Sequence, residues 1–282
     1  AEWPVLTFVT AVIICALPVF LFIAVYALVA IYAELKVSSF MQDKVGPMGQ
    51  GVGFHAWKFG ILQPVADALK LILKEDIIPD LADKKLFVMA PFVVFVGAFI
   101  SFAALPFGQN IIIADMNIGI FYILAVGSLS VIGIILAGWS SNNKWSLYGS
   151  MRAAAQIISY EIPIGLSLLL VVLVAGSLHL GDIVQWQADH RWFIFHSPFT
   201  FLAFFIFYIS TIAETNRTPF DIPEAESELV AGWMTEYSGF RWALFFLSEY
   251  ANMLIVSIVA SIVFLGGWLS PLQIFNIFPD SW

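Results

Sequence analysis

The stretch RAAAQIISYEIPIGLSLLLVVLVAG, residues 152–176, is predominantly apolar after its first arginine. A transmembrane helix needs about 20 such residues to cross the hydrocarbon layer, so this stretch predicts a membrane-spanning helix. Glu161 is the one acidic residue within it. A carboxylate is costly at membrane depth and is a functional-site candidate wherever it occurs there. The stretch therefore predicts an integral membrane protein and a functional role for Glu161.

Five further apolar runs surround this stretch and are too long and continuous for barrel strands. The composition agrees, because only 11% of the 282 residues are charged, against about 25% in soluble domains. We expect an all-α integral membrane protein with a single multi-spanning domain over residues 1–282. The predicted spans are residues 5–32, 86–105, 117–138, 152–176, 198–216 and 241–268.

The composition also argues against several classes of protein. In so apolar a chain, the net charge of −8 gives no indication of a nucleic-acid partner, and none is expected. The single cysteine, Cys15, excludes a disulfide framework within the chain. One thiolate also cannot hold an iron–sulfur cluster alone, because such clusters take about four. We expect no metal site.

The basic residues predict the orientation of the chain in the membrane. Eleven of the twelve Lys and Arg residues lie in the first, third and fifth connections between the predicted spans or begin the span that follows one of them. Arg191 is the one basic residue on the other side. Basic residues concentrate in the cytoplasmic loops of membrane proteins. We therefore expect these three connections in the cytoplasm and the N-terminus outside.

The first cytoplasmic connection contains an amphipathic pattern. In GILQPVADALKLILKE, residues 60–75, apolar residues recur at helical spacing, whereas Asp67, Lys70 and Lys74 are polar. Pro64 suits the first turn of a helix. We expect an amphipathic helix over residues 55–75 that lies in the membrane interface. The alternative is an ordinary connecting helix packed on protein.

Four carboxyl groups are expected within or at the edge of the predicted spans. At a rise of 1.5 Å per helical residue, Glu161 would lie about 14 Å along its helix from Arg152, at the cytoplasmic end of that span. Glu249 would lie about 12 Å along its helix from Arg241. Glu214 ends the fifth span, and Glu34 closes the first. Burial favours the neutral form of a carboxyl group, so such groups can bind and release protons near neutral pH. The alternative is that each glutamate pairs with an arginine or a helix end.

A further set of acids lies in the expected cytoplasmic loop, residues 214–240. Its segment TPFDIPEAESE, residues 218–228, contains two prolines, which break a regular helix and restrict the backbone. The segment has no basic residue, and crowded carboxylates raise one another's pKa values. This rigidity favours a functional acidic loop over a merely solvated one. The acids are Asp221, Glu224, Glu226 and Glu228.

Three classes of function remain from the residues alone: a subunit of a redox-driven proton translocase, an ion-coupled transporter, and a structural membrane anchor. A haem-carrying cytochrome is disfavoured, because all four histidines lie outside the predicted spans and cannot supply an axial ligand there. If the chain serves electron transfer, the redox centre belongs to a partner. The histidines are His55, His179, His190 and His196.

Three motifs resemble one protein family closely. They are AELKVSSFMQDKVGP (33–47), RAAAQIISYEIPIGLSLL (152–169) and AETNRTPFDIPEAESELVAGWMTEYSGFRWALFFLSEYANM (213–253). In this order they resemble the quinone-chamber membrane subunit of respiratory complex I, the NADH–quinone oxidoreductase of bacteria and mitochondria. The resemblance implies a subunit that forms much of a quinone chamber and links quinone reduction to proton translocation.

The resemblance also implies roles for individual residues. The family's row of carboxylates, a proton path, corresponds to Glu161, Glu214, Glu224, Glu226, Glu228 and Glu249. Polar positions along the quinone path correspond to Glu34, Lys36, Asp67, Lys70 and Arg217. The amphipathic helix would frame the entrance for the isoprenoid tail.

The resemblance implies the surroundings of the chain as well. Ubiquinone or menaquinone would be the substrate, whereas FMN and iron–sulfur clusters would reside in partner subunits. The partners would be the iron–sulfur subunits of the hydrophilic arm, small membrane subunits and antiporter-like subunits, within lipid. The expected location is the bacterial cytoplasmic membrane, with the mitochondrial inner membrane as the alternative.

The sequence departs from the family pattern in three places. Leu35 replaces a usual arginine, and the segment MGQGVGFHAWKFGIL, residues 48–62, is longer than usual. The family has eight spans, whereas six are predicted here. The alternative function is the related subunit of a membrane-bound hydrogenase or ferredoxin-linked pump, which keeps the proton path but need not bind quinone.

Overall fold

The computed structural model describes residues 4–48, 58–109, 111–224 and 226–269, in which the extended elements are helices and no β-strand occurs. Within these residues, five helical segments are long and apolar enough to cross a membrane: Ala16–Met41, Lys84–Ala104, Gly119–Ser140, Lys144–Ala175 and Gly239–Phe264. The fifth expected span corresponds to a shorter apolar helix, α9 (Pro198–Glu214). The predicted all-α membrane fold is confirmed.

The chain forms two compact units. Residues 1–78 and 237–251 make up the first, and residues 79–236 and 252–282 the second. The last long helix, α11 (Gly239–Phe264), contributes its first half to the first unit and its second half to the second.

The first unit contains α1 (Pro4–Met41) and the amphipathic helix α2 (Gln63–Leu73). Pro64 lies in the first turn of α2, as its position in the sequence predicted. This helix is shorter than the expected range 55–75, of which residues 55–57 lie outside the described part. Phe59 and Gly60 have φ angles of 63° and 67° in a short 3₁₀ turn, and this left-handed backbone cannot continue an α-helix.

The segment that follows α2 is tied to the start of α11. Arg241 NH2 lies 3.0 Å from Asp76 Oδ2. Ser238 Oγ accepts a hydrogen bond from the Ile77 amide over 3.3 Å and donates one to the Glu75 carbonyl over 3.4 Å. These contacts fix the chain where it leaves the amphipathic helix.

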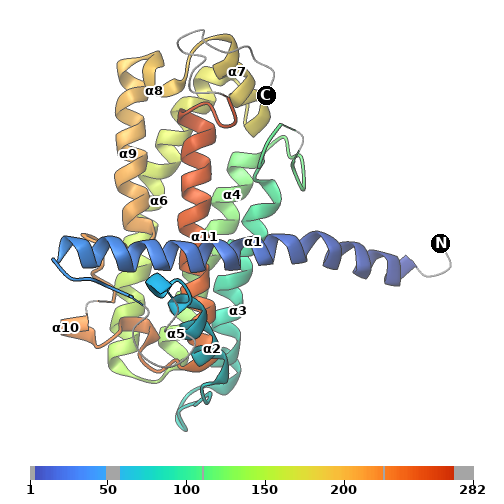
Figure 1. The fold of residues 1–282 in the computed structure, drawn as a ribbon. Coiled ribbons are helices and arrows are strands. Elements are labelled where there is room, and N and C mark those ends of the chain that lie inside the picture. The colour runs from blue at the N-terminus through green and yellow to red at the C-terminus, as the bar shows by residue number, and fades with distance from the viewer. Residues whose placement is uncertain (1–3, 49–57, 110, 225, 270–282) are drawn as a thin grey trace. The chain divides into compact units, whose positions relative to one another are not determined.

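The second unit is a helical bundle. In it α3 packs against α4 and α5, α5 packs against α6, and α6 packs against α9, with their axes roughly aligned (Figure 1). Phe264 of α11 contacts the rings of Phe204 and Phe207 on α9, which places the end of α11 in this bundle. The remaining bounds are α3 Lys84–Ser101, α4 Gly119–Gly127, α5 Leu129–Ser140 and α6 Lys144–Ala175.

Local hydrogen bonds set the ends of these helices. The Asn143 side chain accepts from the Trp145 amide over 2.9 Å and starts α6 eight residues before the expected beginning at Arg152. Gly176, with φ of 74°, ends α6 where only a residue tolerant of left-handed backbone fits. Because α6 begins early, Glu161 lies near its middle.

The connection between α6 and α9 contains two short helices that the sequence did not predict, α7 (Leu180–Asp189) and α8 (Phe193–His196). His179, His190 and His196 lie at the ends of these helices and not in a predicted span, whereas His55 lies outside the described residues. Both helices are too short to cross a membrane.

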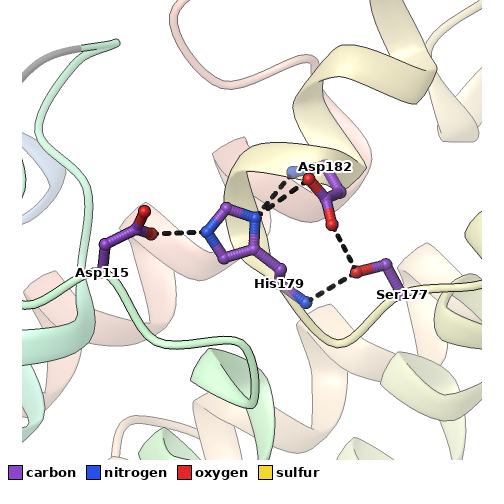
Figure 2. Close-up of polar contacts among 4 residues, drawn as sticks. All are labelled: Asp115, Ser177, His179 and Asp182. Atoms are coloured by element: carbon purple, nitrogen blue, oxygen red, sulfur yellow. Dashed lines mark hydrogen bonds and ion pairs between the residues drawn. The ribbon is translucent and has the colours of Figure 1, made fainter.

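A cluster of four polar residues holds the first turn of α7 (Figure 2). His179 Nε2 lies 2.5 Å from Asp115 Oδ1, in the connection between α3 and α4, and its Nδ1 lies 3.1 Å from Asp182 Oδ1. Ser177 Oγ donates to Asp182 Oδ2 over 2.7 Å. The hydrogen bond with Asp115 is the main cause that raises the pKa of His179, and the bond from Ser177 is the main cause that lowers the pKa of Asp182. The cluster thus ties two connections at the same end of the bundle.

Candidate functional site

The acidic connection after α9 is attached along one face of α6. At its far end, Asn143 Nδ2 donates to Glu236 Oε1 over 2.5 Å. Further along α6, Arg152 NH1 donates to Glu228 Oε2 over 2.9 Å. Beyond that, the ring of Tyr160 meets Phe220 edge to face at 5.4 Å. This connection is therefore a docked element and not a freely solvated loop.

A glycine on α6 permits the closest part of this docking. A Cβ atom at Gly149 would lie 2.6 Å from the Gly232 Cα and 2.7 Å from the Trp233 amide nitrogen, which are backbone atoms. Residues Gly232–Met234 form a short 3₁₀ turn, η4, and Trp233 is buried beside this contact. Small residues allow helices and neighbouring backbone to approach closely. The acidic connection thus packs backbone to backbone on α6.

The end of α9 is held by a side chain of α6. Gln156 Nε2 lies 2.8 Å from the Ala213 carbonyl, 3.1 Å from Asn216 Oδ1 and 2.8 Å from the Phe220 carbonyl. Asn216 has φ of 50°, a left-handed conformation that asparagine tolerates and that terminates α9. Glu214, the last residue of α9, lies between two of these anchored residues.

The acids of the connection have different surroundings. Asp221 is exposed, Glu224 is partly buried, and Glu228 pairs with Arg152, a residue whose proximity no sequence pattern indicates. The backbone of Glu226 begins the short helix α10 (Glu226–Leu229), and its side chain lies outside the described atoms. The range 214–240, expected to be a loop, contains α10, η4 and the first residues of α11.

Glu161 and Glu214 line a common cavity in the second unit. Its volume is about 40 Å³, and it lies among α3, α4, α6, α9 and α11. Ser101 and Asn252 are the other polar residues in its lining. The remaining lining residues are apolar side chains and Gly127. A cavity with room for one water molecule and several polar partners can hold water. Two carboxyl groups and a water-sized space are the elements needed to pass a proton.

The polar residues expected along the quinone path lie mainly in the first unit. Tyr250 Oη donates a hydrogen bond to Glu34 Oε2 over 2.6 Å. Lys36 Nζ donates to the Pro47 carbonyl. Lys70 Nζ lies 3.5 Å from Asp67 Oδ1 on α2, and the side chains of this pair are 66% and 42% exposed. Each residue therefore has a defined partner, and the Asp67–Lys70 pair remains accessible.

Arg217, expected on the quinone path, and Glu249, expected on the proton path, lie in different units. Arg217 lies in the second unit directly after α9, and its amide donates to the Ile212 carbonyl over 3.1 Å. Glu249 lies on the part of α11 that belongs to the first unit. The structure brings Glu161 and Glu214 together, and it places Glu249 three residues before Asn252 on the same helix.

Three residues of these sites were not singled out from the sequence. Gln156, Asn252 and Tyr250 carry polar groups within predicted spans, and polar residues there are rare enough to merit attention. They were missed because amides and phenols do not ionise as readily as the carboxyl groups that the prediction followed. A search for amide and phenol side chains within the predicted spans, in addition to carboxyl groups, would have found all three residues.

Comparison with known proteins gives the family. The sequence profile of the NADH dehydrogenase family matches residues 13–280. A protein of Chlorobaculum parvum, named as the H-type subunit of NADH-quinone oxidoreductase, is 54% identical over 266 residues, which cover 93% of this chain and 72% of the relative. A protein of the same name from a Geobacillus strain is 51% identical over 272 residues, which cover 96% and 79%. The chain belongs to this family of NADH-quinone oxidoreductase membrane subunits, which are components of respiratory complex I.

Proposed function

We propose that this chain is the quinone-chamber subunit of a proton-translocating NADH–quinone oxidoreductase and links quinone reduction to proton translocation through a row of carboxyl groups. The observation that carries this proposal is the cavity shared by Glu161 and Glu214. A structural anchor has no need of two carboxyl groups around a water-sized space. The alternative of a hydrogenase subunit is disfavoured by relatives at 51–54% identity that are named for quinone reduction.

In this proposal the proton path runs through Glu161 and Glu214 and continues through Glu249 on α11. Three acids of the docked connection would extend the path toward the quinone chamber: Glu224, Glu226 and Glu228. A carboxyl group is suited to this task because it can alternate between its neutral and ionised forms at modest cost. The chain itself holds no redox centre in this proposal. The electrons would come from FMN and iron–sulfur clusters of partner subunits.

The quinone path would use Glu34, Lys36, Asp67, Lys70 and Arg217. The apolar side of α2 suits an isoprenoid tail, and the Asp67–Lys70 pair offers a charge and a hydrogen-bond donor to a polar headgroup. The substrate would be ubiquinone or menaquinone.

A test of the quinone path uses Asp67→Asn and Lys70→Ala. We expect each variant to assemble but to lose about tenfold in quinone reductase activity, because each removes a charged group that the proposal places against the quinone headgroup, and a hydrogen bond to a charged group is worth about 1.5–3 kcal/mol. Electron transfer from NADH to a hydrophilic artificial acceptor should continue, because it does not use this chain. The measurement is steady-state kinetics with a short-chain quinone, normalised to assembled complex.

The matched controls for this test are Lys74→Ala, just after α2, and Asp80→Asn. Both residues are exposed and should leave the quinone kinetics unchanged. Quinone kinetics equal to the wild type in assembled Asp67→Asn and Lys70→Ala would exclude this pair from the path.

The proposed orientation places the acidic connection and α2 on the cytoplasmic side and the α7 and α8 segment outside. The orientation is supported by the distribution of basic residues, because eleven of the twelve Lys and Arg residues lie on the side assigned to the cytoplasm. The proposed location is the bacterial cytoplasmic membrane. There the partners would be the iron–sulfur subunits of the hydrophilic arm, small membrane subunits and antiporter-like subunits.

Cysteine labelling tests this orientation. In a Cys15→Ser background, a cysteine introduced at Lys144 should react with a membrane-impermeant maleimide only from the cytoplasmic side. A cysteine introduced at Asp189, the last residue of α7, should react only from outside. Intact cells and inverted vesicles provide the two sides. The opposite labelling pattern would reverse the proposed topology.

A further inference from the structure

We propose that Gln156 is the positioning residue through which the acidic connection controls the Glu161–Glu214 cavity. This inference rests on the proposed proton path and adds to it a residue that carries no charge and transfers no proton. Its basis is the set of three contacts that the Gln156 amide makes with two segments of the chain.

The first of these segments is the end of α9. The Ala213 carbonyl already accepts a hydrogen bond from the Asn216 amide over 3.3 Å, and Gln156 adds a second, shorter one over 2.8 Å. Ala213 is fully buried and directly precedes Glu214. A change at Gln156 therefore shifts the backbone that carries one of the two cavity carboxyl groups.

The second segment is the start of the acidic connection. Gln156 reaches Asn216 Oδ1 at 3.1 Å and the Phe220 carbonyl at 2.8 Å, and the Phe220 ring packs on Tyr160, one helical turn along α6. Glu161 follows Tyr160 directly. One amide group thus joins the connection, the end of α9 and the helix that carries Glu161.

The chemistry of the amide explains why glutamine serves here. All three neighbouring atoms are oxygens that accept hydrogen bonds, and an NH₂ group has two hydrogens to share among them. An ionised carboxylate in its place would face three acceptors and repel them. A methionine would match the shape of glutamine but donate nothing, which would leave the acceptors without this partner.

Because these contacts join the two segments, movement of the acidic connection is transmitted to the cavity. When the connection is held against α6, Gln156 keeps the end of α9 in place and the spacing of Glu161 and Glu214 is fixed. When it is displaced, the same amide loses its partners and that spacing changes. Quinone chemistry that moves the connection would in this way alter proton transfer between the two carboxyl groups.

The test compares Gln156→Met and Gln156→Glu in the assembled complex, with the rate of proton translocation, normalised to assembled complex and to the wild type at the same pH, as the readout. We expect Gln156→Met to lower this rate by about tenfold, because a displacement on the order of 1 Å can cost up to 100-fold in a positioned reaction. Gln156→Glu should be as defective at pH 8 but recover part of the rate at pH 6, since the protonated carboxyl regains one donor. A purely structural role gives no such recovery.

Three comparisons make the outcome decisive. Gln185→Met, on the exposed side of α7, is the matched control and should translocate protons as the wild type does. Asn216→Gly keeps the left-handed backbone, removes one of three acceptors and should have a smaller effect than Gln156→Met. If Gln156→Met does not assemble, the pH dependence of Gln156→Glu decides alone.

Failure of this inference can be told apart from failure of the proposed function. A wild-type rate of proton translocation in Gln156→Met, or a Gln156→Glu rate that does not change with pH relative to the wild type, would overturn the inference while the proton path stands. Wild-type proton translocation in the Gln variants of the path carboxyl groups, Glu161→Gln, Glu214→Gln and Glu249→Gln, would overturn the path itself.

Discussion

Glu161→Gln and Glu214→Gln are each expected to assemble and yet to lose proton translocation by about 100-fold, because a positioned proton-transfer group commonly contributes that much or more to a rate. Glutamine keeps the size and hydrogen-bonding capacity of glutamate but cannot ionise. If the two residues only held helices together, glutamine would serve nearly as well. The shared cavity makes this result expected at both positions.

The measurement is proton uptake by vesicles, normalised to assembled complex, together with quinone reduction. Quinone reduction should fall with translocation if the two are tightly coupled. Asp replacement should retain more activity than Gln, since it keeps a titratable group about one methylene out of place. Glu75→Gln, an exposed residue just after α2, is the control and should have no effect.

Glu249→Gln extends the same test to the proposed continuation of the path on α11. We expect the same loss there, because a proton that reaches Glu161 and Glu214 needs a further acceptor. Wild-type translocation in all three Gln variants would show that the buried acids are structural.

Hydropathy was sufficient to predict the long apolar helices, but it predicted neither their ends nor the short helices between them. The span expected at 152–176 begins earlier in the structure, as the helix Lys144–Ala175. The polar residues near its start suggested a loop, but the Asn143 side chain caps the helix before them. The fifth span was right in place, although α9 is short for a transmembrane helix. Helices α7 and α8 were missed because each is short and mixed in polarity, and their polar contacts join residues distant in sequence, such as His179 and Asp115.

The carboxyl groups were predictable as a set, whereas their partners were not. Acidic residues in apolar runs stand out in any sequence, and this identified Glu161 and Glu214. Nothing in the sequence indicates that Arg152 pairs with Glu228, 76 residues away. The same is true of Gln156, whose role depends on how α6 and α9 pack. Grouping the acids into one path therefore came from the family resemblance, and the cavity now gives two of them a common site.

The close approach at Gly149 leads to the other large expected effect. Gly149→Val places side-chain atoms where the Gly232 and Trp233 backbone now lies, and backbone cannot yield as a flexible side chain can. Overpacking of this kind typically costs about 1–3 kcal/mol, and here the strain falls on the attachment of the acidic connection to α6. We expect the connection to detach locally, become sensitive to protease between α9 and α11, and lose most proton translocation.

Gly165→Ala on the same helix is the matched control, because within the described part of the chain a Cβ atom there meets nothing within 4 Å. Alanine is also the better helix former by about 1 kcal/mol, so this variant should be at least as stable as the wild type. The pair separates the effect of adding a side chain to α6 from the effect of adding it under the acidic connection. If Gly149→Val keeps a protease-resistant connection and full translocation, docking on α6 is not required for function. If it loses both while Gly165→Ala loses neither, the acids act only when the connection that carries them is held on the helix of Glu161.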